Sequence, residues 1–166
     1  MHRPLLKLRA LSLVAIGALA VLATSASAQL SIEITGAGAN RIPVAIADFG
    51  GEAGLSRALT SVIRADLERS GLFKMVDTTG TAMNESTAPA YGDWRNRGAD
   101  ALAAGSLGTG GDGRMEARFR LYDINKQQPL AGVAYPTSTA TLRTAAHRIA
   151  DVIYEKLIGE PGVFST

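Results

Sequence analysis

The stretch Ile42–Asp77, IPVAIADFGGEAGLSRALTSVIRADLERSGLFKMVD, decides the fold because it predicts a strand, a helix and a second strand in succession. Apolar residues dominate positions 42–49, and the glycine pair at 50–51 breaks this run. Between residues 55 and 69 the apolar side chains recur at helical spacing, and Gly71 ends the pattern. A second apolar run follows directly. A strand–helix–strand unit of this length predicts a sheet with the helix laid across one face.

The chain downstream predicts three further strands and a second long helix. Small apolar residues from 99 to 107 indicate a central strand that is packed on both faces. A glycine-rich hairpin turn precedes strict alternation from 114 to 123, and residues 130–135 form another apolar run. The last helix has an apolar stripe over residues 142–157 and ends at Gly159. The fold class predicted from these patterns is α/β, close to α+β.

Residues 1–28 have the pattern of a secretory signal peptide. Three basic residues open the segment, an apolar run covers Ala10–Ala23, and Ala-Ser-Ala ends it at Ala28. The apolar run is shorter than the roughly 20 residues that a membrane-spanning helix needs. We therefore expect cleavage after Ala28 rather than a membrane anchor, and no direct membrane span in the mature chain.

Cleavage would change the charge balance of the protein. Removing Arg3, Lys7 and Arg9 from the 17 Lys and Arg leaves 14, against 15 Asp and Glu. A chain so close to neutrality is not expected to bind nucleic acid or an anionic membrane surface. The protein contains no cysteine, so its core must stabilise it without disulfides. Export without cysteine is typical of a bacterial periplasmic domain, and we expect the periplasm as its location.

The sequence offers little for catalysis. His147 is the one histidine of the predicted mature chain, and Asp48 follows the first strand at the position where α/β folds often place an acidic site residue. The glycine-rich segment 108–113 lacks the Lys-Ser/Thr pair of a phosphate-binding loop. We predict no catalytic, cofactor-binding or metal-binding residues and no enzyme. A small hydrolase that uses Asp48 and His147 is the alternative.

Three other groups of polar or aromatic residues have a structural interpretation. Arg114, Arg118 and Arg120 share one face of a predicted strand with Glu116, which favours a solvated sheet face over a binding patch. Trp94 is expected to pack a short helix onto the sheet. On the first long helix, Asp66 is expected to be a flanking charge that pairs with Arg57 or Arg69.

The segment Gln29–Thr35 alternates cleanly between apolar and polar side chains. Leu30, Ile32 and Ile34 lie on one side of the predicted strand, and Ser31, Glu33 and Thr35 lie on the other. Gly36 and Gly38 then supply a flexible hinge. One interpretation is an ordinary edge strand of the sheet, and the other is a segment that leaves the domain and pairs with another protein by strand addition.

Five motifs together resemble one known family. They are RIPVAIADF at 41–49, IRADLERSGLF at 63–73, WRNRGADALAAG at 94–105, FRLYD at 119–123 and AHRIADVIYEKLIGEPGVFST at 146–166. In this order they resemble the N-terminal domain of TolB, the periplasmic component of the Tol-Pal system of Gram-negative bacteria. The resemblance covers the predicted mature chain, and it implies an anticodon-binding-domain-like fold with a mixed sheet of about five strands and two main helices packed on it.

The resemblance also implies an organisation and a partner. It divides the mature chain into a TolB-box strand with its hinge (29–41), the α/β domain (42–160) and a linker stub (161–166) to a β-propeller that the sequence does not contain. In the family the TolB box binds the C-terminal domain of TolA, which assigns partner binding to Gln29–Thr35. The propeller carries most of the contact with the lipoprotein Pal, so Pal binding is not carried over to this chain.

The function implied by the resemblance is a non-enzymatic interaction module of the Tol-Pal system. Such a module contributes to outer-membrane integrity and to invagination of that membrane during cell division. The alternative is a free-standing periplasmic adaptor, or a regulator of cell-wall synthesis, that carries a TolB-like domain.

Overall fold

A computed structural model describes residues 40–166 of the chain. The expectations for the signal peptide, the strand Gln29–Thr35 and the hinge at Gly36 and Gly38 therefore concern residues outside the described part. Within it, six strands and three helices follow one another as β1 (Ile42–Ile46), β2 (Gly50–Gly51), α1 (Ala53–Arg69), β3 (Phe73–Val76), α2 (Tyr91–Asn96), β4 (Ala101–Thr109), β5 (Met115–Asp123), β6 (Gln128–Pro136) and α3 (Leu142–Ile158).

All six strands belong to one mixed sheet. Its order is β3-β1-β4-β5-β6, and β2 pairs with β4 outside this path. Strands β1, β3 and β4 run parallel, whereas β4, β5 and β6 form an antiparallel meander. The predicted strand–helix–strand unit is confirmed, because α1 connects β1 to its parallel neighbour β3. The mixed α/β architecture with two main helices is confirmed as well.

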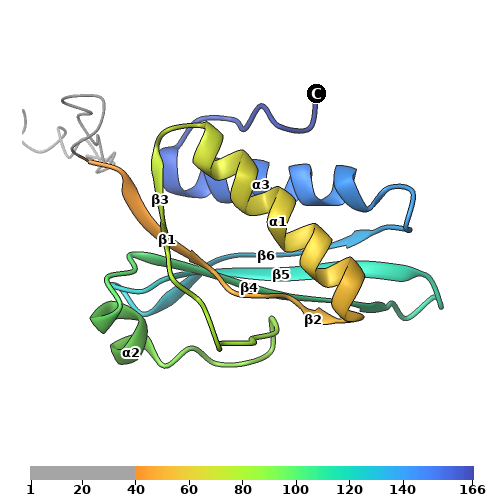
Figure 1. Cartoon of the computed structure of the whole chain (residues 1–166), viewed down its shortest axis with the longest axis horizontal. Coiled ribbons are helices and arrows are strands. Elements are labelled where there is room, and N and C mark those ends of the chain that lie inside the picture. The colour runs from red at the N-terminus through yellow and green to blue at the C-terminus, as the bar shows by residue number, and fades with distance from the viewer. Residues whose placement is uncertain (1–39) are drawn as a thin grey trace, which may run out of the picture. The chain divides into compact units, whose positions relative to one another are not determined.

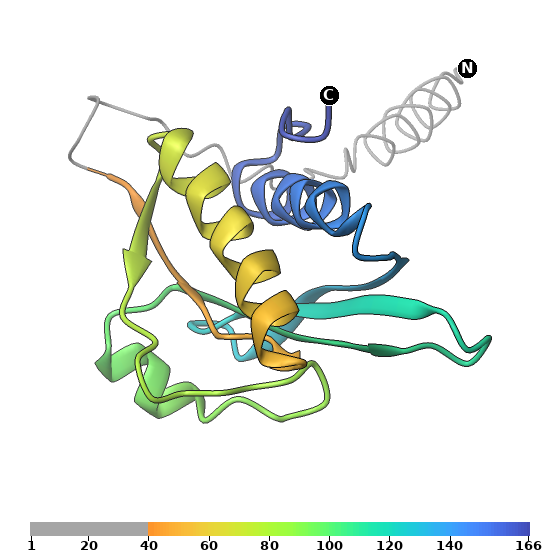
Figure 2. The same ribbon diagram turned by 45° about the vertical axis from the view of Figure 1, so that its right-hand side comes forward.

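The two long helices cover one face of the sheet, and the short helix α2 lies on the other (Figure 1). Figure 2 shows α1 and α3 side by side above the strands. Their apolar stripes bury Ile63, Leu67 and Ile149 completely against strand residues such as Val44 and Phe119. At about 25 cal/mol for each Å² of apolar surface removed from water, this layer is the main stabilising contribution to the fold.

The opposite face has a smaller apolar layer built around Trp94. Its indole is 3% exposed and packs with Leu102, Tyr122 and Ile124. The predicted role of Trp94 in packing the short helix onto the sheet is therefore confirmed. The layer covers only part of this face, because Arg120 on β5 and Gly132 and Ala134 on β6 are exposed.

The ends of the long helices have identifiable causes. Glu52 is the N-cap of α1, and its carboxylate accepts hydrogen bonds from the amides of Gly54 (3.0 Å) and Leu55 (2.8 Å). These amide donors hold the pKa of Glu52 below its ordinary value. At the other boundary, α3 ends at Gly159 with a left-handed backbone (φ 88°), as the sequence predicts.

One part of the sheet differs from the sequence-based expectations. The glycine pair that was expected only to break the first strand forms β2, which pairs with Ser106 and Leu107 of β4. Gly51 has φ 117°, and a Cβ atom at this position would lie 2.1 Å from the carbonyl oxygen of Leu107, so only glycine fits. The strand count is consequently six rather than about five.

The C-terminal tail, residues 161–166, lies against α3. The amides of Phe164 and Ser165 donate to the two carboxylate oxygens of Asp151, at 2.8 and 3.1 Å. The ring of Phe164 meets Tyr154 edge to face, and Tyr154 meets Phe73 in the same way. The tail, interpreted from sequence as a linker stub, is thus packed against α3.

Candidate functional site

The predicted partner-binding segment Gln29–Thr35 lies outside the described residues, but the structure shows what this segment is attached to. The described chain opens with exposed Asn40 and Arg41 and enters β1 at Ile42, whose amide donates to the carbonyl of Leu72 at 2.9 Å. Strand β1 is paired with β3 on one side and with β4 on the other. A segment that folded back along β1 would find no open edge there.

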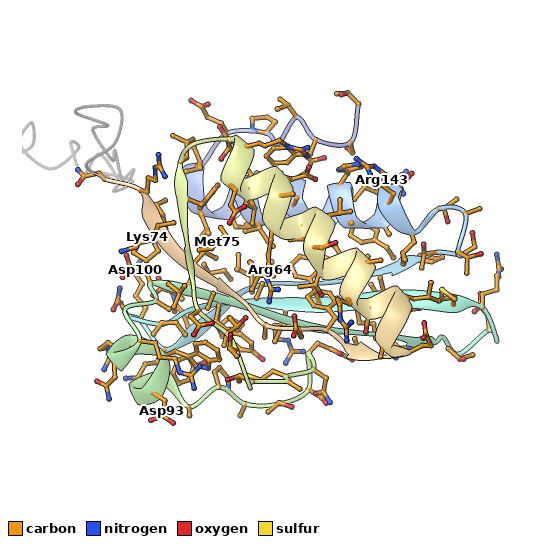
Figure 3. The ribbon with its side chains drawn as sticks, viewed as in Figure 1. Arg64, Lys74, Met75, Asp93, Asp100 and Arg143 are labelled. Atoms are coloured by element: carbon orange, nitrogen blue, oxygen red, sulfur yellow. The ribbon has the colours of Figure 1, made fainter. Side chains whose placement is uncertain are left out.

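Asp48 belongs to a network at the end of β1. Arg64 reaches from α1 to this end (Figure 3), where it donates to the carbonyl of Ile46, to Asp48 at 3.0 Å and to the hydroxyl of Thr78 at 2.8 Å. Thr78 also donates to the Ile46 carbonyl. The Asp48 carboxylate thus pairs with Arg64, and Arg64 joins α1 and Thr78 of the segment after β3 to the end of β1.

His147 belongs to a different network, between the two long helices. Its Nδ1 atom lies 2.5 Å from a carboxylate oxygen of Asp66, and the other oxygen of Asp66 pairs with Arg69. Asp66 is only 1% exposed. The predicted pairing of Asp66 with Arg69 is confirmed, whereas its expected place at the flank of the helix is wrong, because Asp66 is buried. Asp48 and His147 therefore do not form the dyad that the hydrolase alternative requires.

The arginines of β5, and Arg114 just before it, mostly have local partners. Arg114 pairs with Asp112 at 2.9 Å, and Arg118 pairs with Glu116 at 2.5 Å. Arg118 also donates to the carbonyl of Thr109. The interpretation as a solvated sheet face with Glu116 as a partner is confirmed for Arg118. Arg120 differs, because it is exposed and takes part in neither of these pairs.

Shallow depressions indent the described surface. One of them, about 360 Å³, lies at the start of α1 and is lined by residues that include Leu55, Leu107 and Met115. A second, about 240 Å³, lies between α1 and the first turn of α3 beside Arg143, which Figure 3 labels. The third, about 200 Å³, lies beside Trp94 and Arg97. Each is lined by apolar and polar side chains, and none contains Asp48 or His147.

Sequence reasoning did not predict two contacts that carboxylates make with distant parts of the chain. Asp66 contacts a histidine 81 residues away, and Asp151 contacts the tail across 13 residues. The spacing of residues in the sequence around Asp66 or Asp151 does not predict either contact. The one usable signal for Asp66 was its place on the edge of an otherwise apolar helical stripe, because a charge there needs a buried partner.

Comparison with known proteins gives a consistent result. The sequence model of the TolB amino-terminal domain matches residues 30–130. The Tol-Pal system protein TolB of Dechloromonas aromatica is 61% identical over 145 residues, which are 87% of this chain and 34% of the relative. The protein of the same name from Nitrosomonas europaea is 52% identical over the same shares. The chain thus spans about a third of the length of these curated relatives.

The fold comparison agrees. The crystal structure of TolB from Acinetobacter baumannii superimposes on 80% of this chain with a TM-score of 0.66 and 30% sequence identity, and the match covers 32% of that chain. Among residues 40–166, no helix has both the length and the apolar character required to cross a membrane. The family model matches more than half of the sequence, so the chain belongs to the TolB amino-terminal domain family.

Proposed function

We propose that the protein is a non-enzymatic, periplasmic protein-interaction module of the Tol-Pal system. In this proposal a cleavable signal peptide, residues 1–28, directs export, and the segment Gln29–Thr35 binds the C-terminal domain of TolA. Through that contact the protein contributes to outer-membrane integrity and to invagination during cell division. The observation that carries the proposal is the family match, which includes most of the binding segment because it begins at residue 30.

Strand addition is the proposed mode of binding. An added strand gains affinity from its backbone hydrogen bonds and specificity from the side chains on alternate positions. The apolar side chains Leu30, Ile32 and Ile34 would face the partner's core, with Ser31 and Glu33 between them on the solvent side. Gly36 and Gly38 would let the segment leave a sheet in which β1 has both edges occupied.

Deletion of Gln29–Thr35 tests the proposal directly. The deletion is expected to abolish binding of the isolated TolA C-terminal domain from the same organism in isothermal titration calorimetry. The thermal unfolding midpoint should stay unchanged, because the described core begins at β1. A deletion variant that binds TolA with the original affinity would contradict the proposal.

A matched pair of substitutions tests the orientation of the segment. Ile32→Asp places a charge on the apolar face and is expected to weaken TolA binding at least tenfold, since burying an unpaired carboxylate is strongly unfavourable. Ser31→Asp places the same charge on the polar face and should change the affinity much less. Equal losses for both variants would exclude the proposed orientation.

A further inference from the structure

The free edge of strand β6 is the longest open backbone edge of the described sheet. Strand β6 is the last strand of the sheet: it pairs with β5 on one side and with no described strand on the other. The opposite edge strand, β3, has only four residues and carries exposed Lys74 (Figure 3), and a short strand with a lysine is a typical protection against unwanted pairing. By contrast, β6 has nine residues and no charged side chain.

The hydrogen-bond pattern shows which backbone groups of β6 are available. The amide of Thr137 donates to the carbonyl of Met115 at 2.9 Å, which fixes the phase of the antiparallel ladder. In such a strand the backbone N–H and C=O groups of every second residue bond to the neighbouring strand, and those of the residues between point away from it. Gly132 and Ala134, which lie opposite Arg120 and Arg118, therefore direct their amides and carbonyls to the free edge.

Proline limits this edge at its end. Pro136 follows Gly132 and Ala134 at the same two-residue spacing, so its backbone also faces the free edge. Proline has no N–H group, and it cannot donate a hydrogen bond to an added strand. The open stretch thus centres on Gly132 and Ala134, both of which are exposed. The neighbouring residues Leu130, Val133 and Tyr135 are half-buried. The open part of the β6 edge is therefore short and apolar.

Arg120 gives this edge a chemical preference. It is exposed on β5 directly opposite Gly132, and its Nε atom lies 3.5 Å from where a Cβ atom of Gly132 would be. Because glycine has no side chain, the Arg120 side chain lies against the face of the sheet at Gly132. An acidic side chain on a strand added next to Gly132 would meet this arginine.

The β6 edge of a second copy does not supply that acidic group. The residues of β6 include no Asp or Glu, and pairing two β6 edges would bring a second Arg120 to the same face. Two positive charges on one face repel each other, and no side chain of the added strand would neutralise them. The charge pattern therefore favours an extended segment of a different protein.

We propose that β6 is an acceptor edge for an extended segment of a partner protein, which hydrogen-bonds to Gly132 and Ala134 and places an acidic side chain against Arg120. This interface is separate from the segment Gln29–Thr35 and does not depend on the role proposed for it. With only two outward-facing residues at its centre, the edge suits weak and reversible association.

The test uses the whole chain, labelled with ¹⁵N, and two synthetic peptides. Both alternate threonine and valine, and they differ only in a central glutamate or lysine on the threonine face. The glutamate peptide is expected to shift the amide resonances of Gly132 and Ala134 and to bind more tightly than the lysine peptide. If neither peptide changes the amide resonances of Gly132 and Ala134, the proposal is overturned.

Three variants sharpen the result. Ala134→Pro removes an outward N–H group and should abolish binding, whereas the matched control Ala134→Val keeps that group and should bind. Arg120→Glu should weaken binding of the glutamate peptide by about threefold or more and strengthen binding of the lysine peptide, since opposite charges across strands attract and like charges repel. Circular dichroism confirms that each variant is folded.

Two outcomes would contradict the proposed partner. If Ala134→Pro binds the glutamate peptide as well as the unchanged protein does, the edge is not the site. If the resonances of Gly132 and Ala134 instead move with protein concentration in the absence of peptide, and this movement disappears in Ala134→Pro, the edge is occupied by a second copy.

Discussion

At the scale of single residues, the carboxylate of Asp66 is a buried charged group that needs partners within the fold. It is 1% exposed and lies between the two long helices, where it contacts His147 of α3 and Arg69 of its own helix. A carboxylate in such a place is tolerated only when its hydrogen bonds are made, because burial of an unpaired charge is costly. The contact of Asp66 with His147 therefore fixes how α3 sits on α1.

His147→Ala is expected to lower the free energy of unfolding by about 1–3 kcal/mol, the typical cost of leaving a buried polar group without one of its partners. Urea denaturation measures this quantity. Glu68→Ala on the exposed side of α1 is the control, and it should stay within about 0.5 kcal/mol of the unchanged protein. Equal stability of the His147 variant and the control would show that the contact does not hold the helices together.

Glu52 predicts a dependence on pH at the start of α1. Its folded-state pKa lies below the ordinary value of 4.5, because the amides of Gly54 and Leu55 bind the charged form. The stabilising contribution is therefore complete above pH 4.5 and is lost as the pH falls through the lowered folded-state value. We expect Glu52→Gln to have a lower melting temperature than the unchanged protein at neutral pH, with the difference shrinking in acid. A difference that grows in acid would contradict this account of the cap.

At the scale of elements, the C-terminal tail is held by one side chain of α3. Asp151 accepts the amides of Phe164 and Ser165, and Gly162 passes so close that a Cβ atom there would lie 2.3 Å from the Asp151 carboxylate. Asp151→Ala is expected to speed hydrogen exchange at these two amides at least tenfold, since a hydrogen bond to a charged acceptor contributes about 1.5–3 kcal/mol. NMR-detected exchange measures the rates, and Glu155→Ala, one turn along α3, is the control. Unchanged exchange in the Asp151 variant would show that the aromatic contacts alone hold the tail.

Elements with strong local patterns were predictable from the sequence. Alternation identified β5, small apolar residues identified the doubly buried strand β4, and helical spacing with Gly159 identified α3. The sequence did not predict β2, because two glycines carry no β pattern and pair only through their close approach to β4. The docked tail was missed for a similar reason, since its anchor lies on another element. The alternation of Gln29–Thr35 and the hinge after it stay predictions, because they lie outside the described residues. The open edge at Gly132 could not be predicted, because it depends on strand order and register.

At the scale of the whole molecule, the two apolar layers share the same strands. Along β1, Val44 and Ile46 are buried under the long helices, whereas Ala45, and Ala47 just after the strand, are buried under the Trp94 layer. Strand β4 alternates in the same way. Loss of either layer would expose one side of strands whose pairing the other layer needs. The described domain should therefore unfold in a single step.

The one tryptophan of the chain makes this testable without a substitution. Fluorescence of Trp94 reports the smaller layer, and far-ultraviolet circular dichroism reports mainly α1 and α3. In urea the two signals are expected to change with one midpoint and one slope, because cooperative unfolding gives coincident transitions. A fluorescence transition at lower urea would show that the Trp94 layer opens first, as its smaller apolar cluster and large alanine content would allow. Trp94→Phe should then shift the circular dichroism midpoint only if the two layers are coupled, which separates local opening from global unfolding.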